Sequence, residues 1–140
     1  GGMVIADRYT TSNMVHQASK MDDIGERANF LDWLDQYEYG LYKLPRPREV
    51  YFLDVPVDVS QDLIRDRKNK FTNESEKDIH ESDKGYLVKT YENSKFVADK
   101  YQWHIVNCLD QDRNMRSVDQ IHEEIYSRVI SAIESRKKDL

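Results

Sequence analysis

Residues 50–55 read V-Y-F-L-D-V, an apolar run that lies between Glu49 and Pro56. Two further short apolar runs occur along the chain, M-V-I-A at residues 3–6 and H-I-V-N-C-L at residues 104–109. Their length and their β-branched residues are typical of buried strands. Helical patterns separate the three runs, so the sequence predicts an α/β fold with a parallel sheet and helices on both of its faces.

The helical patterns cover residues 26–41, 59–67 and 82–101 and a last segment that opens at Ser117. In the first pattern, apolar residues recur at steps of three and four and should share one buried face: Phe30, Leu31, Leu34, Tyr37 and Leu41. The last helix has a capping signal, because the Ser117 hydroxyl can accept from the backbone while Gln120 reaches back. Its apolar stripe consists of Val118, Ile121, Ile125, Val129 and Ile133.

The chain has 140 residues, a length that favours a single domain. Its net charge of −5 argues against a general nucleic-acid-binding surface. Cys108 is the only cysteine, which excludes an intrachain disulfide and a multi-cysteine zinc site. No apolar run has the length of a membrane span, and the N-terminal residues do not resemble a signal peptide. We therefore expect a cytoplasmic protein.

Residues 65–85 differ in composition from the rest of the chain. Only Phe71 and Ile79 are large and apolar there, and basic and acidic side chains alternate around them. Such a segment is expected to be either a solvated loop or a lid that closes over an anionic ligand.

Charged residues follow two of the predicted strands. Asp7 and Arg8 come directly after residues 3–6, and Asp54 lies at the end of the central run. The carboxyl ends of parallel strands meet at one sheet edge, so these groups should lie together there. A carboxylate suits Mg²⁺ and an arginine suits phosphate, although Asp7 and Arg8 also fit a structural ion pair.

A polar cluster follows Arg8 in the sequence. Asn13, His16 and Gln17 have the spacing of one helix face, with Ser12 next to them. A side-chain amide offers both an acceptor and donors, which matches the N3–H and O4 edge of a pyrimidine. The alternative is an ordinary helix start capped by Thr11 or Ser12, with Asn13 and Gln17 merely solvated.

The sequence has five glycines, at positions 1, 2, 25, 40 and 85. Their spacing does not allow the motif G-x-x-x-x-G-K-[ST], so this chain contains no phosphate-binding P-loop.

Taken in order, several segments resemble thymidylate kinase, a family that phosphorylates dTMP with ATP. V-I-A-D-R-Y at residues 4–9 is similar to the family's strand and D-R-[YH] motif, and S-N-x-x-H-Q at residues 12–17 is similar to its continuation. The family's next strand and the segment before it are similar to L-P-R-P at residues 44–47 followed by V-Y-F-L-D-V-P at residues 50–56. The resemblance continues through Leu63 to Arg67 and D-I-H-E at residues 78–81 into the last helix.

The resemblance implies a P-loop-NTPase-like fold with three layers, a parallel sheet between helices, that is incomplete because the P-loop strand is missing. Residues 1–140 would be the C-terminal two-thirds of one nucleoside monophosphate kinase domain, with residues 65–85 as its lid. The full-length protein would be a cytoplasmic homodimer that converts ATP and dTMP to ADP and dTDP for dTTP synthesis, without nucleic-acid or membrane partners. The fragment alone would be inactive.

The resemblance also implies roles for individual residues. Asp7 would place Mg²⁺, directly or through water, and Arg8 would hold the dTMP phosphate. Ser12, Asn13 and Gln17 would read thymine, and His16 would lie near the sugar. Arg65 and Arg67 would reach ATP from the lid, Arg67 as a catalytic residue, helped by Lys68 or Lys70. Two alternatives stay open: another nucleoside monophosphate or deoxynucleoside kinase, and a non-catalytic interaction module with the kinase fold.

Overall fold

The computed structural model describes residues 2–71 and 80–138, with side chains for residues 2–65 and 84–135. The protein is mixed α/β and mostly helical. Its elements, in chain order, are α1 (Thr11–Ala18), α2 (Ile24–Asp35), the π-helix η1 (Gln36–Leu41), β1 (Tyr51–Asp54), α3 (Val57–Phe71), α4 (His80–Lys100), β2 (His104–Asn107) and α5 (Val118–Lys138).

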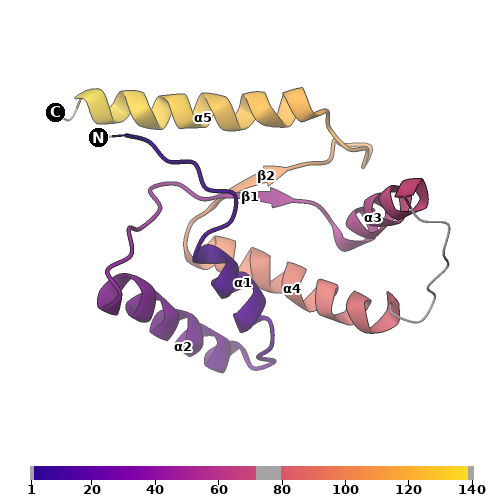
Figure 1. The fold of residues 1–140 in the computed structure, drawn as a ribbon, viewed down its shortest axis with the longest axis horizontal. Helices are drawn as coiled ribbons and strands as arrows, with labels where there is room; N and C mark the ends of the chain where they lie inside the picture. Colours follow the sequence, from indigo (N-terminus) through magenta and orange to yellow (C-terminus); the bar gives the residue numbers. More distant parts are fainter. Residues whose placement is uncertain (1, 72–79, 139–140) are drawn as a thin grey trace.

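Strands β1 and β2 form a parallel pair in which Tyr51 lies opposite His104 and Asp54 opposite Asn107. Helix α5 runs along one side of this pair, and α4 runs along the other side together with α1 and α2 (Figure 1). Two of the three predicted strands are therefore confirmed, as are their parallel direction and the helices on both sides. Parallel strands of this kind need such cover because their faces are apolar.

The prediction of a strand at residues 3–6 is wrong for this structure. Among residues 2–71 and 80–138 the segment has no strand partner, and Val4 and Ile5 are 90% and 80% exposed. A strand exists only where a neighbouring strand takes its backbone hydrogen bonds, so an apolar pattern alone does not form one.

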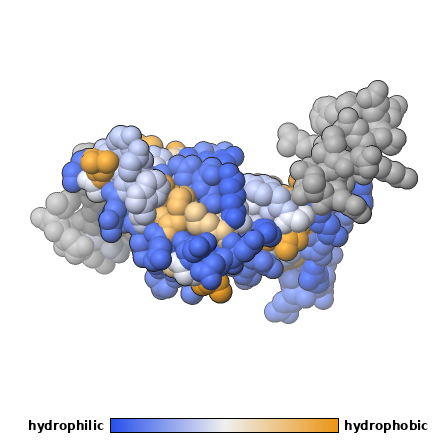
Figure 2. Space-filling model, turned by 90° about the horizontal axis from the view of Figure 1, so that it is seen from below, coloured by the Kyte–Doolittle hydropathy of each residue, from blue (hydrophilic) through white to orange (hydrophobic). Residues whose placement is uncertain are grey.

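The hydrophobic core lies between α1, α2 and α4. Its buried members are Met14, Ala18, Leu31, Leu34 and Val97, and aromatic residues from α2, η1 and the end of α4 pack around them. Hydrophilic residues dominate the outer face seen from below, over α2 and α4, with a smaller apolar area among them (Figure 2). Among the described residues, no helix combines the length and the apolar character needed to cross a membrane.

The predicted apolar face of residues 26–41 is confirmed in its first half only. Leu31 and Leu34 are buried, but Leu41 is 69% exposed and Glu38 is buried instead. Glu38 follows Leu34 by four residues and so lies on the same helix face, whereas the wider turn of η1 rotates Leu41 off that face.

The helices predicted over residues 59–67 and 82–101 are confirmed, and both extend further into the segment 65–85 than predicted, which corrects the loop prediction at its ends. Helix α3 continues to Phe71 and α4 already begins at His80. Alternating charges do not prevent a helix, because oppositely charged side chains three or four residues apart support one, as Arg65 and Asp62 do. Residues 72–79 lie outside the described part of the chain.

Candidate functional site

Helix α1 carries four of the five residues predicted to bind dTMP, and its core side fixes its position. Met14 is 2% exposed and Ala18 is fully buried, and both pack with residues of α2 and α4. Ser12, Asn13, His16 and Gln17 lie on the remaining sides of the helix and are partly or fully exposed. The structure therefore brings these four residues together on one accessible surface.

The C-terminal end of α1 is closed by partners for all four of its last carbonyl groups, which have no acceptor role inside the helix. The amide of Asn93 in α4 donates from Nδ2 to the oxygens of Val15 at 2.6 Å and Met14 at 3.0 Å. Val15 is the first of the last four residues, and the carbonyls of the other three, His16, Gln17 and Ala18, accept from Ser19 Oγ, Lys20 N and Met21 N. Asn93 thus caps α1 from another element and holds it against α4.

Arg8 precedes α1 with its backbone in the left-handed region, at φ 66°. This conformation is unfavourable for a residue with a side chain. Its Nε donates to Ser12 Oγ at 3.1 Å. Within the described part of the chain, its two terminal nitrogens have no protein partner, so they are open to an anion. The prediction that Asp7 and Arg8 form an ion pair is not what the structure shows, because the described ion pairs include neither residue.

His16 lies one turn beyond Ser12 on α1. Its Nδ1 is 3.1 Å from the hydroxyl of Tyr86 in α4, and the two rings stack with their centroids 6.5 Å apart. Partial burial lowers the pKa of His16 from its ordinary value, and the positive charge of Arg8 lowers it further. The neutral form is therefore favoured, which leaves Arg8 as the cation of this surface.

The two amides of the predicted cluster have different surroundings. Asn13 Nδ2 donates to Oε1 of Glu38 at 3.0 Å, and Glu38 is only 5% exposed. Gln17 accepts from Lys20 Nζ at 2.8 Å, a local contact on an exposed surface. Neither Glu38 nor Asn93 stands out in the sequence, because both act on α1 from positions far along the chain.

Asp7 lies in the exposed N-terminal segment, and no described hydrogen bond or ion pair includes it. The described residues also contain no group of three side chains suited to bind a metal. A single free carboxylate nevertheless fits Mg²⁺, which proteins often hold by one or two carboxylates while waters and substrate phosphates complete the coordination.

Of the predicted ATP-binding cations, only Arg65 has a described side chain. It is exposed on α3 and pairs with Asp62 at 2.8 Å. Arg67, Lys68 and Lys70 belong to the same helix, and their side chains lie outside the described residues.

Asp54 ends β1, as predicted, and is 7% exposed. Its two carboxylate oxygens accept from Tyr91 Oη at 2.7 Å and Lys95 Nζ at 3.3 Å, both on α4. The bond to Asp54 raises the pKa of Lys95, and burial followed by the same carboxylate raises that of Tyr91. Asp54 therefore anchors α4 to the sheet. Its predicted neighbours Asp7 and Arg8 are not bonded to it.

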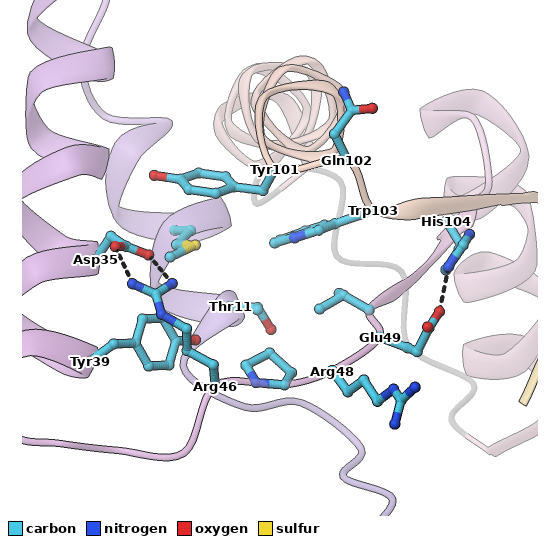
Figure 3. Close-up of a pocket in the computed structure, with 13 residues that line it drawn as sticks. Thr11, Asp35, Tyr39, Arg46, Arg48, Glu49, Tyr101, Gln102, Trp103 and His104 are labelled. Atoms are coloured by element: carbon cyan, nitrogen blue, oxygen red, sulfur yellow. Dashed lines mark hydrogen bonds and ion pairs between the residues drawn. The ribbon is translucent and has the colours of Figure 1, made fainter. Parts of the chain in front are cut away.

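A cavity of about 340 Å³ lies at the opposite, amino-terminal end of the strands (Figure 3). Arg46 is one of its lining residues and donates to both oxygens of Asp35 at 2.7 and 2.6 Å, with its guanidinium 4.3 Å from the Tyr39 ring centre. Tyr101 and Trp103 form its inner wall. Burial, followed by the charges of Asp32 and Asp35, raises the pKa of Tyr101 to about 12. Arg46 is thus engaged by Asp35 and Tyr39.

The comparisons with known proteins add no relative to this picture. No protein-family model, no curated protein and no solved structure matches the chain.

Proposed function

We propose that this chain belongs to a phosphotransferase of the thymidylate kinase type, which transfers the terminal phosphoryl group of ATP to dTMP. The observation that supports the proposal best is the surface of α1, where Arg8 lies beside two exposed amides. Ser12 holds Arg8 by its Nε and leaves the terminal nitrogens open. Asn13 and Gln17 follow on the same accessible side of the helix.

In this proposal Arg8 binds the phosphate of dTMP. The two terminal nitrogens of a guanidinium form parallel hydrogen bonds to two phosphate oxygens, which fixes both the position and the orientation of that group. The lowered pKa of His16 keeps the neighbouring imidazole neutral, so Arg8 supplies the positive charge while His16 contacts the sugar without competing for the phosphate.

The amides of Asn13 and Gln17, together with the hydroxyl of Ser12, would recognise the base. An amide carbonyl accepts from the ring N3–H of thymine and an amide N–H donates to its O4, so the two groups together complement the base edge. Phosphoryl transfer asks the protein mainly for such positioning and for charge neutralisation. The α1 surface supplies both on the dTMP side.

On the ATP side, Asp7 would hold Mg²⁺ through its water shell. The ion would neutralise charge on the transferring phosphate when bound. Arg65, Arg67, Lys68 and Lys70 would contact ATP from α3. The sequence lacks G-x-x-x-x-G-K-[ST], so we propose that the activity also requires a polypeptide segment that provides this loop, and that the complete enzyme is a homodimer.

The test is dTMP phosphorylation by the product of the complete reading frame, with other nucleoside monophosphates as competing substrates. Arg8→Ala should weaken dTMP binding about 10- to 100-fold, as expected when hydrogen bonds from a charged donor are lost. Arg48→Ala is the matched control, because Arg48 is exposed at the other end of the strands. No turnover of any monophosphate would favour the non-catalytic module, and unchanged dTMP kinetics in Arg8→Ala would refute the role of Arg8.

A further inference from the structure

Glu38 is an unusual residue in its surroundings. It is the buried member of η1, 5% exposed, whereas its sequence neighbours Tyr37 and Tyr39 are half-buried. One carboxylate oxygen, Oε1, accepts from Asn13 at 3.0 Å. The other, Oε2, is fully buried and has no partner among the described residues. Burying a carboxyl group with so few donors is costly for folding, so its presence calls for an explanation.

The contact with Glu38 determines which end of the Asn13 amide remains for a ligand. A carboxylate can only accept hydrogen bonds, so Asn13 must direct an N–H of its amide toward it. The carbonyl oxygen of Asn13, an acceptor, is then left on the exposed side of α1. Without Glu38 the amide could rotate by half a turn and present its donor end instead.

We infer that Glu38 is a positioning residue that sets the base preference of the site by fixing the Asn13 amide. The inference rests on the function proposed above. A fixed acceptor matches the N3–H donor of thymine and uracil. It does not match cytosine, whose N3 is itself an acceptor, and two facing acceptors cannot form a hydrogen bond. Glu38 would therefore favour dTMP over dCMP without touching either nucleotide.

Glu38 lies on the buried face of its own helix. It follows Leu31 by seven residues and Leu34 by four, and residues at this spacing share one helix face. Glu38 stays buried on this face through η1, whereas Leu41 at the end of η1 is exposed. The backbone carbonyl of Glu38 also accepts from Leu44 N at 3.1 Å, which holds the residue in place as the chain leaves the helix.

The test compares dTMP and dCMP as substrates of the complete reading-frame product carrying Glu38→Gln. Glutamine has the same shape, can donate or accept, and so no longer fixes the Asn13 amide. We expect kcat/KM for dTMP to fall about tenfold relative to that for dCMP, the size of one charged hydrogen bond. Asp35→Asn is the matched control, because this nearby carboxylate pairs with Arg46 and, among the described hydrogen bonds, makes none to Asn13.

Two further variants separate positioning from a merely structural role. In an Asn13→Ala background, Glu38→Gln should have no further effect on the ratio, because the group that it acts through is absent. Combining Asn13→Asp with Glu38→Gln inverts the pair: the glutamine donates to one aspartate oxygen, and the other oxygen again faces the base as an acceptor. This double variant should recover the preference for dTMP over dCMP.

The inference would be overturned if Glu38→Gln left the ratio of kcat/KM for dTMP to that for dCMP unchanged. It would also be overturned if Glu38→Gln lowered this ratio equally in the Asn13→Ala background. Neither result would affect the proposed function. Failure of the parent protein to phosphorylate dTMP would overturn the proposed function and the inference with it. Nuclear magnetic resonance distinguishes these cases, because the side-chain N–H signals of Asn13 in the 140-residue chain should shift in Glu38→Gln whether or not the protein is a kinase.

Discussion

Replacing Asn93 by alanine should destabilise the protein by about 2 kcal/mol. The variant loses two hydrogen bonds to α1, each contributing about 1 kcal/mol, and leaves the Val15 carbonyl without its partner at a further cost of about 1–3 kcal/mol. It also removes Asn93 Oδ1, a buried oxygen that has no partner among the described residues. Removing that oxygen returns about 1–3 kcal/mol, so the two desolvation contributions offset each other.

The assay is urea denaturation of the 140-residue chain followed by far-ultraviolet circular dichroism. A fall in the midpoint at constant m-value would report a loss of stability with no change in the surface exposed on unfolding. Glu92→Ala is the control, because Glu92 neighbours Asn93 in α4 and is exposed, so its effect should stay within about 0.5 kcal/mol. A change below about 1 kcal/mol in Asn93→Ala would refute the conclusion that Asn93 holds α1 in place.

Three further outcomes follow from other contacts. Tyr101→Phe should be neutral or stabilise the protein by up to about 1 kcal/mol, because the Tyr101 hydroxyl is buried without a partner in the described chain; a loss of stability in thermal unfolding would reveal a hidden partner. Burial and Arg8 lower the pKa of His16, so its resonance titration should have a midpoint below the ordinary value, and Arg8→Ala should raise that midpoint. Because unfolded His16 takes up its proton at higher pH than folded His16, its contribution to stability is present above the unfolded pKa of about 6.5 and is lost as the pH falls through the lower folded value. A midpoint that Arg8→Ala leaves unchanged would place the two side chains too far apart to interact. Ser117→Ala should cost about 1 kcal/mol, because Ser117 and Gln120 cap α5 reciprocally; an unchanged urea midpoint would show that α5 does not depend on this cap.

The features that could be predicted from the sequence are the local ones. The cap formed by Ser117 and Gln120 depends on residues three positions apart, and the structure confirms it. Strands β1 and β2 follow from short β-branched runs, and the clustering of Ser12, Asn13, His16 and Gln17 follows from helical spacing. In each case the sequence signal lies within one short segment, where periodicity is informative, although the pairing of β1 with β2 is itself a contact between distant segments.

The features that could not be predicted depend on contacts between distant parts of the chain. Glu38 meets Asn13 across 25 positions, and Asn93 meets Val15 across 78. The exposure of Leu41 depends on the π-turn before it, which helical periodicity does not reveal. A strand at residues 3–6 requires a neighbour that the described fold does not provide. Tertiary contacts therefore override the local pattern at these positions.

The parallel pairing of β1 and β2 has a consequence for the order of folding. Tyr51 and His104 must come together across α3 and α4, because parallel strands cannot be joined by a tight hairpin. Closing so long a segment carries an entropic cost that is recovered only when its contacts form, and such distant contacts slow folding. We therefore expect helical signal to appear early in refolding and strand pairing late. The cap that Asn93 provides for α1 also joins residues far apart in the sequence, 78 positions in the case of Val15. The surface around Arg8 should therefore form in the same late phase, after most of the helical structure is already present.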